Sequence, residues 1–543
     1  MKTREKICLY LIHFLLLTTV VPSSSLSSSS GAERKNKKLK ILGVFSHPGK
    51  SHFDVFKPLL EELANRGHDL TVVSYFPRTN SSSALPNYKD IDLTGPEGVF
   101  LEIVDLKKIK HSILTVYREF MLLRHWGLEH CQKNLANRDV QKLIKSNAKF
   151  DLIITEVFNS DCFLGFVHRF KAPFIGLSSH VLFPWANARL SNEHNPSYVP
   201  TVLLGFGPKM NFMERVGNYV IRKIFNLGYE VFYNRPMQKI VEKSFGPNVP
   251  PLGDLAKNMS VILVNMHYSL QGSKPNLPSV VEVGGLHISE KQQSLPGDIQ
   301  RFLDDAKEGV VFFSWGSMIK ASSMGEETLR EIVKALRSIP WKVIWKWEDE
   351  DLPGKPENVM IKKWVPQAAI LGHPNVKCYL AHGGLLGVSE SVSAGVPMVI
   401  VPMYGDQFNN AAAARSRGVA LVLEWNNLDA ESLKAAIDKI FNDQRYKKNA
   451  KALQKAWHER PMSALETSIW WSEYVARGHG NYYLKTAAAD LTWYQLELLD
   501  VIVFLLLIIL IVILVFYKIV NVIIRKIFTS LQNFQSDFSK KHN

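Results

Sequence analysis

The stretch from Trp364 to Gln407 carries the densest set of residues able to do chemistry. It contains an indole, a strand-like segment that ends in His-Gly-Gly, a helix-like segment with a carboxylate, and a second strand-like segment that ends in Asp-Gln. A flat ring can stack on a base, and glycines at a helix N-terminus let backbone N–H groups approach a diphosphate. Carboxylates and amides can hold sugar hydroxyls. The order of these residue types predicts a nucleotide-sugar site.

The candidate residues for the base and the diphosphate lie where strands end. Trp364 could stack on a pyrimidine, and the amide of Gln367 could read its edge. His382 and the backbone at Gly384 could donate to the diphosphate, and the Ser314–Ser317 turn could reach the second phosphate. The alternatives are a core tryptophan and a structural histidine with an ordinary hydrogen bond.

The candidates for the two sugars follow in the sequence. Glu390 lies eight residues after His382, on the helix that begins there, and could accept from both ribose hydroxyls. Asp406 and Gln407 end the next strand and could hold hydroxyls of the transferred sugar. The alternative for Asp406 is a cap of the following helix.

Short apolar strands alternating with helices must position these residues. In the first half the pattern predicts a βαβ opening and therefore a parallel sheet. The predicted elements there are strands at 39–45, 70–76, 150–156 and 172–179 and a helix at 54–65. G-x-G-x-x-G is missing after the first strand, which argues against a nucleotide-dependent oxidoreductase.

A second α/β series begins near Gly284, after a Pro/Gly-rich segment at 274–287 that we interpret as a hinge. Its predicted elements are strands at 310–317, 341–347, 376–381 and 397–402, a helix at 326–338, and a helix capped by Asp429. Two doubly wound domains with a cleft between them are the simplest architecture. Ligands bind such sheets at the carboxyl ends of the strands.

Residues 200–233 mix apolar, aromatic and basic side chains at helical spacing. This segment could lie on a membrane, line an apolar acceptor pocket, or form ordinary buried helices. The pattern does not choose among the three.

The two ends of the chain indicate membrane targeting. Basic residues precede an apolar run at 7–21, which indicates a cleaved leader, with an N-terminal anchor as the alternative. The 17 uncharged residues Val501–Tyr517 reach the lower limit of about 17–25 needed to span a bilayer. Acidic residues precede that run and basic ones follow it, which places the body in the lumen and the tail in the cytosol. Lys540 and Lys541 match a di-lysine retrieval signal of the endoplasmic reticulum, with a solvated basic tail as the alternative.

Composition narrows the partners. The formal charge is 65 − 50 = +15, yet no basic stripe interleaves with aromatic residues, so nucleic acid is an unsupported partner. Beyond Cys8 in the leader, Cys131, Cys162 and Cys378 are an odd number without close spacing, so we expect no disulfide framework and no zinc site. Asn80 and Asn258 begin glycosylation sequons.

The run from Trp364 to Gln407 resembles the signature of the UDP-glycosyltransferases. The leader, C-terminal span and di-lysine tail resemble their membrane-bound animal branch, which includes the UDP-glucuronosyltransferases. The opening at 45–77 and the stretch at 156–166 look most like insect members. The resemblance implies an α/β GT-B fold of two doubly wound Rossmann-like domains plus one C-terminal transmembrane helix. The implied parts are a signal peptide 1–26, an acceptor-binding domain 27–283, a UDP-sugar-binding domain 284–480, a transmembrane helix 498–517 and a cytosolic tail 518–543.

The resemblance also implies roles for single residues. The general base matches His52, with His47 as the fallback. Its acidic partner matches Glu156, where many relatives carry Asp, and Asp161 is a second candidate. The donor-contacting residues implied are Trp364 and Gln367 for uracil, Ser317 and His382 for the diphosphate, Glu390 for the ribose, and Asp406 and Gln407 for the sugar.

The resulting prediction is an inverting transfer of a hexose from a UDP-sugar to a hydroxyl of a small lipophilic acceptor, in detoxification or conjugation of endogenous metabolites. The insect-like opening favours glucose over glucuronic acid, and no metal or bound cofactor is expected besides the UDP-sugar co-substrate. Ala381, Gly387 and Val388 stand at positions where many relatives carry residues with a hydroxyl group, near the phosphates. They motivate an alternative, a non-catalytic membrane-bound carrier or partner subunit. No motif specifies the acceptor or a homo- or hetero-oligomeric state.

Overall fold

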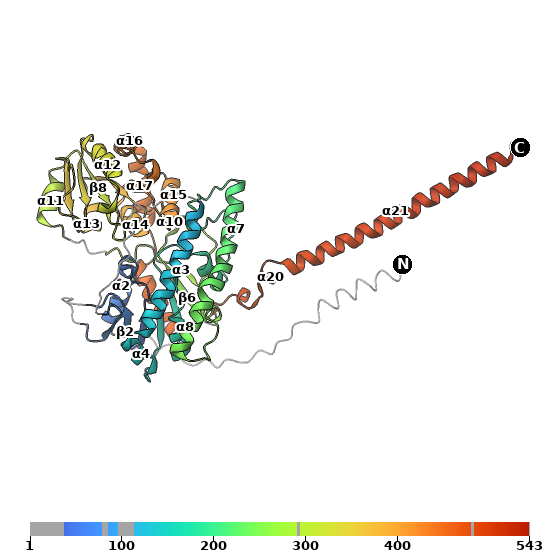
Figure 1. Cartoon of the computed structure of the whole chain (residues 1–543), viewed down its shortest axis with the longest axis horizontal. Coiled ribbons are helices and arrows are strands. Elements are labelled where there is room, and N and C mark those ends of the chain that lie inside the picture. Colours follow the sequence, from blue (N-terminus) through green and yellow to red (C-terminus); the bar gives the residue numbers. More distant parts are fainter. Residues whose placement is uncertain (1–36, 79–84, 96–112, 290–293, 479–482, 542–543) are drawn as a thin grey trace. The chain divides into compact units, whose positions relative to one another are not determined.

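The computed structural model describes residues 37–78, 85–95, 113–289, 294–478 and 483–541 (Figure 1). The chain divides into a short unit, Met1–Lys38, and a unit Leu39–Asn543 that contains every helix and strand described below. The predicted leader, the sequon at Asn80 and the last two residues lie outside the described residues.

Seven parallel strands form the first sheet, in the order β3-β2-β1-β4-β5-β6-β7. Their runs of buried Val, Ile and Leu are typical of strands covered on both faces. Their bounds are β1 Lys40–Val44, β2 Asp69–Ser74, β3 Tyr88–Asp92, β4 Leu152–Glu156, β5 Phe174–Ser178, β6 Val261–Val264 and β7 Val280–Glu282.

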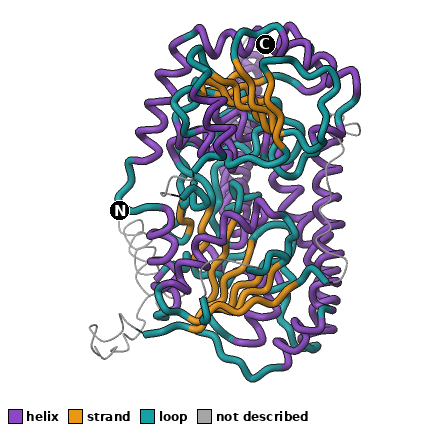
Figure 2. The backbone as a smooth tube through the Cα atoms, turned by 90° about the vertical axis from the view of Figure 1, so that its left-hand side faces the viewer, coloured by secondary structure: helices purple, strands orange, loops and turns teal. Residues whose placement is uncertain are grey.

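Six parallel strands form the second sheet, in the order β10-β9-β8-β11-β12-β13. Figure 2 shows the two sheets as separate groups of strands with helices packed around each. Their bounds are β8 Val310–Ser314, β9 Lys342–Lys346, β10 Val359–Lys362, β11 Val376–Ala381, β12 Met398–Ile400 and β13 Ala420–Val422.

Helices connect the strands of both sheets, as right-handed crossovers between parallel strands require. Those before β8 are α2 Lys50–Asn65, α3 Ile113–Ala136, α4 Arg138–Lys145, α5 Leu164–Phe170, α6 Pro184–Arg189, η2 Val202–Leu204, α7 Phe212–Gly228, the π-helical η3 Tyr229–Asn234, α8 Arg235–Phe245, α9 Leu252–Ala256, α10 Tyr268–Gln271 and α11 Gly297–Asp304. Those after β8 are η4 Ala321–Ser323, α12 Glu326–Arg337, α13 Gln367–Leu371, α14 Leu385–Ala394, α15 Gln407–Ser416, η5 Trp425–Asn427, α16 Ala430–Asn442, α17 Gln444–His458, α18 Ala464–Ala476, η6 Ala487–Asp490, α20 Trp493–Leu496 and α21 Leu499–Lys541.

Alternate residues of each strand enter different cores. In β1, Ile41 packs into one apolar cluster and Leu42 into another, and in β8 Val311 and Phe312 divide in the same way. Leu42 and Phe312 belong to one continuous cluster, so a single core contains one face of each sheet. These Rossmann-like sheets form the GT-B fold, as predicted.

The helix after β1 begins four residues earlier than the pattern indicates. Gly49 is its N-cap, and the Gly49 carbonyl accepts from the backbone N–H of Phe53 (N···O 3.2 Å). A Cβ at Gly49 would lie 2.6 Å from the His47 ring, which explains the glycine there. His52 therefore lies on the first turn of α2 rather than in a loop.

The predicted hinge at 274–287 is not only a connection. Its residues Val280–Glu282 form β7, because the edge of β6 is free to pair with them in parallel register (Ile262 with Val280). Helix α18 comes late in the sequence yet packs on the first sheet, where Ile469 and Val475 share a cluster with Ile41. The residue boundaries of the two domains stay a prediction.

The cysteine spacing, from which we expected no disulfide framework, did not reveal the one disulfide that the described residues contain. Cys131 of α3 and Cys162, in the loop after β4, are joined by a disulfide, with their Cα atoms 5.7 Å apart. The sequence separation of 31 residues hides this pair, because only the packing of α3 beside that loop brings the two together. Cys378 is a buried free thiol.

Helix α7 rules out one of the three interpretations of residues 200–233. One face is buried through residues such as Asn218, Arg222 and Phe225, and it begins with a capping box at Asn211. The opposite face exposes apolar side chains, so α7 is not an ordinary buried helix. The exposed set is Phe212, Met213, Val216, Tyr219, Val220, Ile224 and Leu227.

Helix α21 is the one helix in the described part of the chain that is long and apolar enough to cross a membrane. The candidate span runs over Leu499–Asp537, and none of its side chains is buried, as expected for a helix that contacts lipid. The helix is longer than the predicted span at 498–517, because Lys518 and Arg525 do not interrupt its backbone. Lys223 of α7 forms an ion pair with Glu497, just ahead of α21.

Candidate active site

A histidine and a glutamate from adjacent elements meet at the carboxyl edge of the first sheet. Glu156 is the last residue of β4, β4 pairs with β1, and α2 with His52 follows β1. His52 Nδ1 lies 2.6 Å from Glu156 Oε1. The Glu156 side chain is 4% exposed and that of His52 is 20% exposed, so the pair is buried yet reachable. This arrangement orients an imidazole with its Nε2 available for proton transfer.

Burial sets the protonation of this pair. Burial lowers the pKa of His52 to about 4 and raises the pKa of Glu156 to about 7. The positive end of the α2 dipole disfavours an imidazolium as well. A neutral imidazole can accept a proton, and a neighbouring carboxylate stabilises the cation that results.

Three further histidines surround His52. The His47 ring lies 4.6 Å and the His180 ring 5.8 Å from that of His52, and His130 lies 6.1 Å from His47, all centroid to centroid. Burial lowers the pKa of each. Sequence reasoning missed His130 and His180. The position of His180 just after β5, at the same sheet edge, was the available signal.

Asp161, the second candidate partner of His52, lies elsewhere. Its Oδ2 accepts from Arg189 Nη2 (2.6 Å), and both side chains are buried. The guanidinium of Arg189 also lies over the Tyr229 ring, 4.7 Å from its centroid. The structure therefore brings Glu156, and not Asp161, into contact with His52.

The predicted diphosphate residues meet at the carboxyl edge of the second sheet. His382 follows β11, and Ser317 lies exposed in the turn after the adjacent strand β8. A Cβ at Gly316 would lie 2.7 Å, and one at Gly384 2.5 Å, from the His382 ring. These glycines thus leave room for the imidazole. Its Nδ1 is buried, with no hydrogen-bond partner in the described part of the chain.

Gly387 has a structural reason for lacking a side chain. A Cβ there would lie 2.6 Å from the Tyr379 hydroxyl and 3.1 Å from Gln367 Nε2. Tyr379 is fully buried, and its hydroxyl donates to Gln367 Oε1 (3.5 Å). Tyr379 and Gln367 therefore occupy the space that a side chain at position 387 would need.

The candidates for the base and the ribose are linked by hydrogen bonds. Gln367 Nε2 donates to Glu390 Oε2, and burial raises the pKa of Glu390 to about 7. His287 Nε2 lies 3.7 Å from the other Glu390 oxygen. The Trp364 side chain, between β10 and α13, is 67% exposed, so its indole is free to stack on a planar ligand.

Asp406 begins α15 but makes no side-chain capping bond. Its Oδ2 instead accepts from Asn410 Nδ2 (2.9 Å), which also donates to the Gly383 carbonyl (3.0 Å). Asn410, missed by sequence reasoning, thus joins the Asp406 loop to the His382 loop. Gln407 Oε1 accepts from the backbone N–H of Met403 (2.8 Å), and the Gln407 side chain also hydrogen-bonds the side chain of Tyr404.

Within the described residues, no three His, Cys, Asp or Glu side chains form a group that could hold a metal ion. Independence from metal and cofactor stays a prediction.

Known proteins resemble this chain over most of its length. The family described as UDP-glucoronosyl and UDP-glucosyl transferase matches residues 44–533. From Dactylopius coccus, UDP-glycosyltransferase UGT5 is 39% identical and covers 89% of this chain and 92% of its own length. UDP-glucosyltransferase 2 of that insect is 37% identical, covering 86% of this chain and 90% of its own. The Homo sapiens UDP-glucuronosyltransferase 2B7 is 31% identical, covering 84% and 88%.

Solved structures share the fold at low sequence identity. The crystal structure of UDP-glucose: anthocyanidin 3-O-glucosyltransferase in complex with UDP has a TM-score of 0.54 at 16% identity, covering 82% of this chain and 100% of that one. The glycotransferase of kitacinnamycin has a TM-score of 0.55 at 18% identity, covering 81% and 99%. Both similarities extend across the two sheets.

Proposed function

We propose a specific reaction for this chain, which belongs to the UDP-glucoronosyl and UDP-glucosyl transferase family and is thus an enzyme that transfers a sugar from a UDP-sugar to an acceptor. In this proposal it transfers glucose, with inversion, to a hydroxyl of a small lipophilic molecule. The similarity to a named UDP-glucosyltransferase supports glucose. The relatives do not favour the alternative of a non-catalytic carrier.

The observation that carries the mechanism is the contact of His52 Nδ1 with Glu156 Oε1 at 2.6 Å. In the proposed reaction, the acceptor oxygen forms a bond to the anomeric carbon while the bond from that carbon to the diphosphate breaks. The hydroxyl proton passes to His52 Nε2, and the Glu156 carboxylate stabilises the imidazolium. The electron pair of the broken bond leaves on UDP. Attack opposite the leaving group inverts the anomeric configuration.

The second sheet supplies the stabilisation of the departing UDP in this proposal. Backbone N–H groups at the start of α14 and the His382 ring can donate to the diphosphate, where negative charge develops. Trp364 and Gln367 bind uracil, Ser317 reaches the second phosphate, Glu390 holds the ribose, and Asp406 with Gln407 holds the glucose. Some of these residues are already linked by hydrogen bonds. Gln367 bonds to Glu390 and to Tyr379. Asp406 bonds to Asn410.

The test compares His52→Ala with the exposed His125→Ala as a matched control. We expect His52→Ala to lower kcat by about 10²–10⁴-fold, the range for a lost general base, while the affinity for UDP stays unchanged. Full turnover in His52→Ala would overturn the base assignment. A panel of UDP-glucose, UDP-galactose and UDP-glucuronate tests the donor, and NMR of the product reports the anomeric configuration.

We also propose that the protein is a single-pass protein of the endoplasmic reticulum, with the body luminal and the basic tail cytosolic. The apolar helix α21 and the di-lysine ending support this. The disulfide between Cys131 and Cys162 supports a luminal body, since disulfides persist in oxidising compartments.

Glycosylation tests this orientation. Asn258 is exposed on the body and begins a sequon. Loss of an endoglycosidase-sensitive mass in the double variant Asn80→Gln, Asn258→Gln would support a luminal body. Replacing Lys540 and Lys541 with serine should release the protein to the cell surface, whereas unchanged retention would exclude the di-lysine signal.

A further inference from the structure

A pocket begins one residue after His180, a member of the histidine cluster near the proposed base. It lies at the carboxyl edge of β5 and β6, and Val181 on its wall directly follows His180, whose ring lies 5.8 Å from that of His52. About 420 Å³ of empty space lies in this pocket and in front of its mouth, open solvent included, and the enclosed part has room for about one or two water molecules. Its apolar lining consists of Val181, Leu182, Pro184, Val199, Pro200 and Met266. An apolar wall of this kind suits a hydrophobic ring system.

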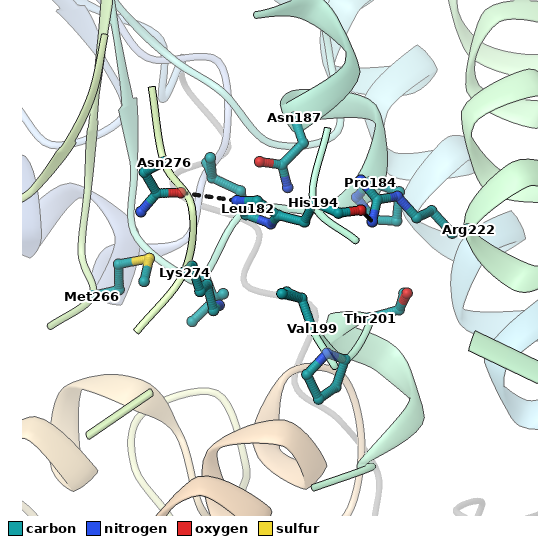
Figure 3. A pocket seen from close by; sticks show the side chains of 12 residues that line it. Leu182, Pro184, Asn187, His194, Val199, Thr201, Arg222, Met266, Lys274 and Asn276 are labelled. Carbon is teal, nitrogen blue, oxygen red and sulfur yellow. Dashed lines mark hydrogen bonds between the residues drawn. The ribbon is translucent and has the colours of Figure 1, made fainter. Parts of the chain in front are cut away.

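Lys274 contributes a positive charge to this apolar pocket. It comes from the loop between α10 and β7, and Figure 3 shows Lys274 and Met266 on one side of the pocket, with Val199 and Thr201 on the other. Lys274 forms no ion pair with any described residue. Burial lowers the pKa of Lys274 to about 8, so the group is largely charged at neutral pH.

The other charged or titratable groups of the pocket are already engaged. Arg222 Nη2 donates to Glu193 Oε2 (2.7 Å), and its Nη1 donates to the His194 carbonyl. His194 Nε2 lies 2.8 Å from Asn276 Oδ1, a contact drawn in Figure 3. Among the described residues, Lys274 is therefore the one cation of this pocket that no carboxylate contacts directly.

Glu282 is the acidic neighbour of Lys274, and its oxygens are occupied by other donors. Oε2 accepts from the backbone of Tyr268 (2.7 Å) and Oε1 from Asn276 Nδ2 (3.4 Å). Glu282 thus interacts with Lys274 at longer range, without direct contact. A partly buried ammonium without a contacting anion is costly unless a ligand supplies the counter-charge.

We propose that Lys274 binds the carboxylate of an acidic, lipophilic acceptor whose ring system lies against the apolar wall at the mouth of this pocket. The inference rests on the proposed transfer to a small lipophilic acceptor and names its chemical class. One carboxylate balances one ammonium, and the apolar wall contacts the ring. Val181 on the pocket wall directly follows His180, whose ring lies 5.8 Å from that of His52, so the pocket and the proposed base share one edge of the first sheet.

The test uses matched pairs of acceptors: hydroxybenzoate, hydroxynaphthoate and hydroxybiphenyl-carboxylate, each with the phenol that lacks the carboxylate. The full chain in detergent is assayed with UDP-glucose, and the ratio of kcat/KM for the acid to that for its neutral partner is measured. The variants are Lys274→Gln, Lys274→Arg and the control Lys239→Gln, an exposed lysine of α8. Thermal unfolding and UDP affinity report the folding of each variant.

We expect the wild-type chain to prefer at least one acid over its neutral partner. Lys274→Gln should lower that ratio by about 10- to 100-fold, as loss of a charged hydrogen bond does, through KM. Lys274→Arg should keep most of the preference, and Lys239→Gln all of it. Above pH 8 the KM of the acid should rise, because Lys274 loses its charge. The groups that face Lys274 are Arg222, His194 and Glu282. Burial lowers the pKa of His194 to about 4, so this histidine does not change its charge above pH 8.

The inference is overturned if the wild type prefers no acid, or if the preference survives in Lys274→Gln. Calorimetric titration of the acids without donor separates an acceptor site from a regulatory one. An acid that binds through Lys274 but is never glycosylated would also contradict it. A chain that transfers sugar to none of the compounds, acidic or neutral, would refute the proposed function instead.

Discussion

Glu119 of α3 accepts a hydrogen bond through Oε1 from the backbone N–H of Gly405, with N···O 3.2 Å. The contact joins the first half of the chain to the loop that carries Asp406. Burial raises the pKa of Glu119 to about 7, and the nearby Asp406 carboxylate raises it further. Two carboxylates therefore share the site where the transferred sugar is proposed to bind, and one of them titrates near neutral pH.

The first prediction concerns the stability of this contact. In the folded chain Glu119 keeps its proton up to about pH 7, whereas an unfolded glutamate loses it near 4.5. Between these values the folded state binds more protons, so wild-type stability falls as pH rises. Glu119→Gln keeps the acceptor oxygen without this titration. Its unfolding temperature should rise relative to wild type between pH 5 and 8, while the exposed control Glu308→Gln tracks wild type. A difference in unfolding temperature between Glu119→Gln and wild type that stays constant from pH 5 to 8 would contradict the raised pKa of Glu119.

A second prediction separates the partner of the base from its alternative. Glu156→Gln keeps the shape of the side chain but cannot stabilise an imidazolium, so kcat should fall by about 10²–10⁴-fold. In Glu156→Asp the kcat should fall less, because the shorter side chain lengthens the 2.6 Å contact with His52 but keeps the negative charge. Initial rates at saturating UDP-glucose measure both. Wild-type kcat in Glu156→Gln would exclude the pair from the mechanism.

A third prediction assigns Asp161 to stability. Asp161→Asn leaves the buried Arg189 charge uncompensated, which costs about 3–5 kcal/mol in comparable pairs. The unfolding temperature should drop by several degrees. The double variant Asp161→Asn, Arg189→Met should recover part of the loss, because both buried charges are removed. If Asp161→Asn has the same unfolding temperature as wild type, the ion pair of Asp161 and Arg189 contributes nothing to stability.

A fourth prediction tests why residue 387 is a glycine. Gly387→Ser places a Cβ 2.6 Å from the Tyr379 hydroxyl, and such overpacking costs about 1–3 kcal/mol. It should also raise the Kd for UDP by displacing Gln367. Adding Tyr379→Phe should restore part of the stability and part of the affinity for UDP, since it removes the oxygen that clashes with the new side chain. Gly325→Ser, at an open helix N-cap, is the control and should not destabilise. Tighter UDP binding in Gly387→Ser would refute this explanation.

A fifth prediction concerns the exposed indole. Trp364→Ala should weaken UDP binding by about 1–3 kcal/mol, the value for one stacked base. The unfolding temperature should not change, because the Trp364 side chain is 67% exposed. Trp493→Ala, with a side chain 71% exposed, is the control and should bind UDP as wild type does. Calorimetric titration gives both constants, and equal affinity in Trp364→Ala would remove the indole from the site.

The order of strands and helices was predictable because it depends on local patterns. Short apolar runs predicted strands at 376–381 and 310–317, which the structure has as β11 Val376–Ala381 and β8 Val310–Ser314, and Asp429 caps α16 as predicted. The edge strands were harder. β3 (Tyr88–Asp92) alternates polar and apolar residues, and β7 lies within a Pro/Gly-rich segment. Their pairing depends on a neighbouring strand that local sequence does not reveal.

The sequence by itself determined which residue types stand at the ends of which strands, and the rule that parallel strands end at a common edge predicted where ligands bind. Tertiary structure alone decided which of them meet. Glu156 contacts His52, which lies 104 positions earlier in the chain, whereas Asp161 pairs with Arg189. Cys131 and Cys162 form a disulfide. The physical reason is range: strand and helix propensities act over a few residues, whereas these contacts depend on the order of strands in the sheet and on the packing of α3 against it.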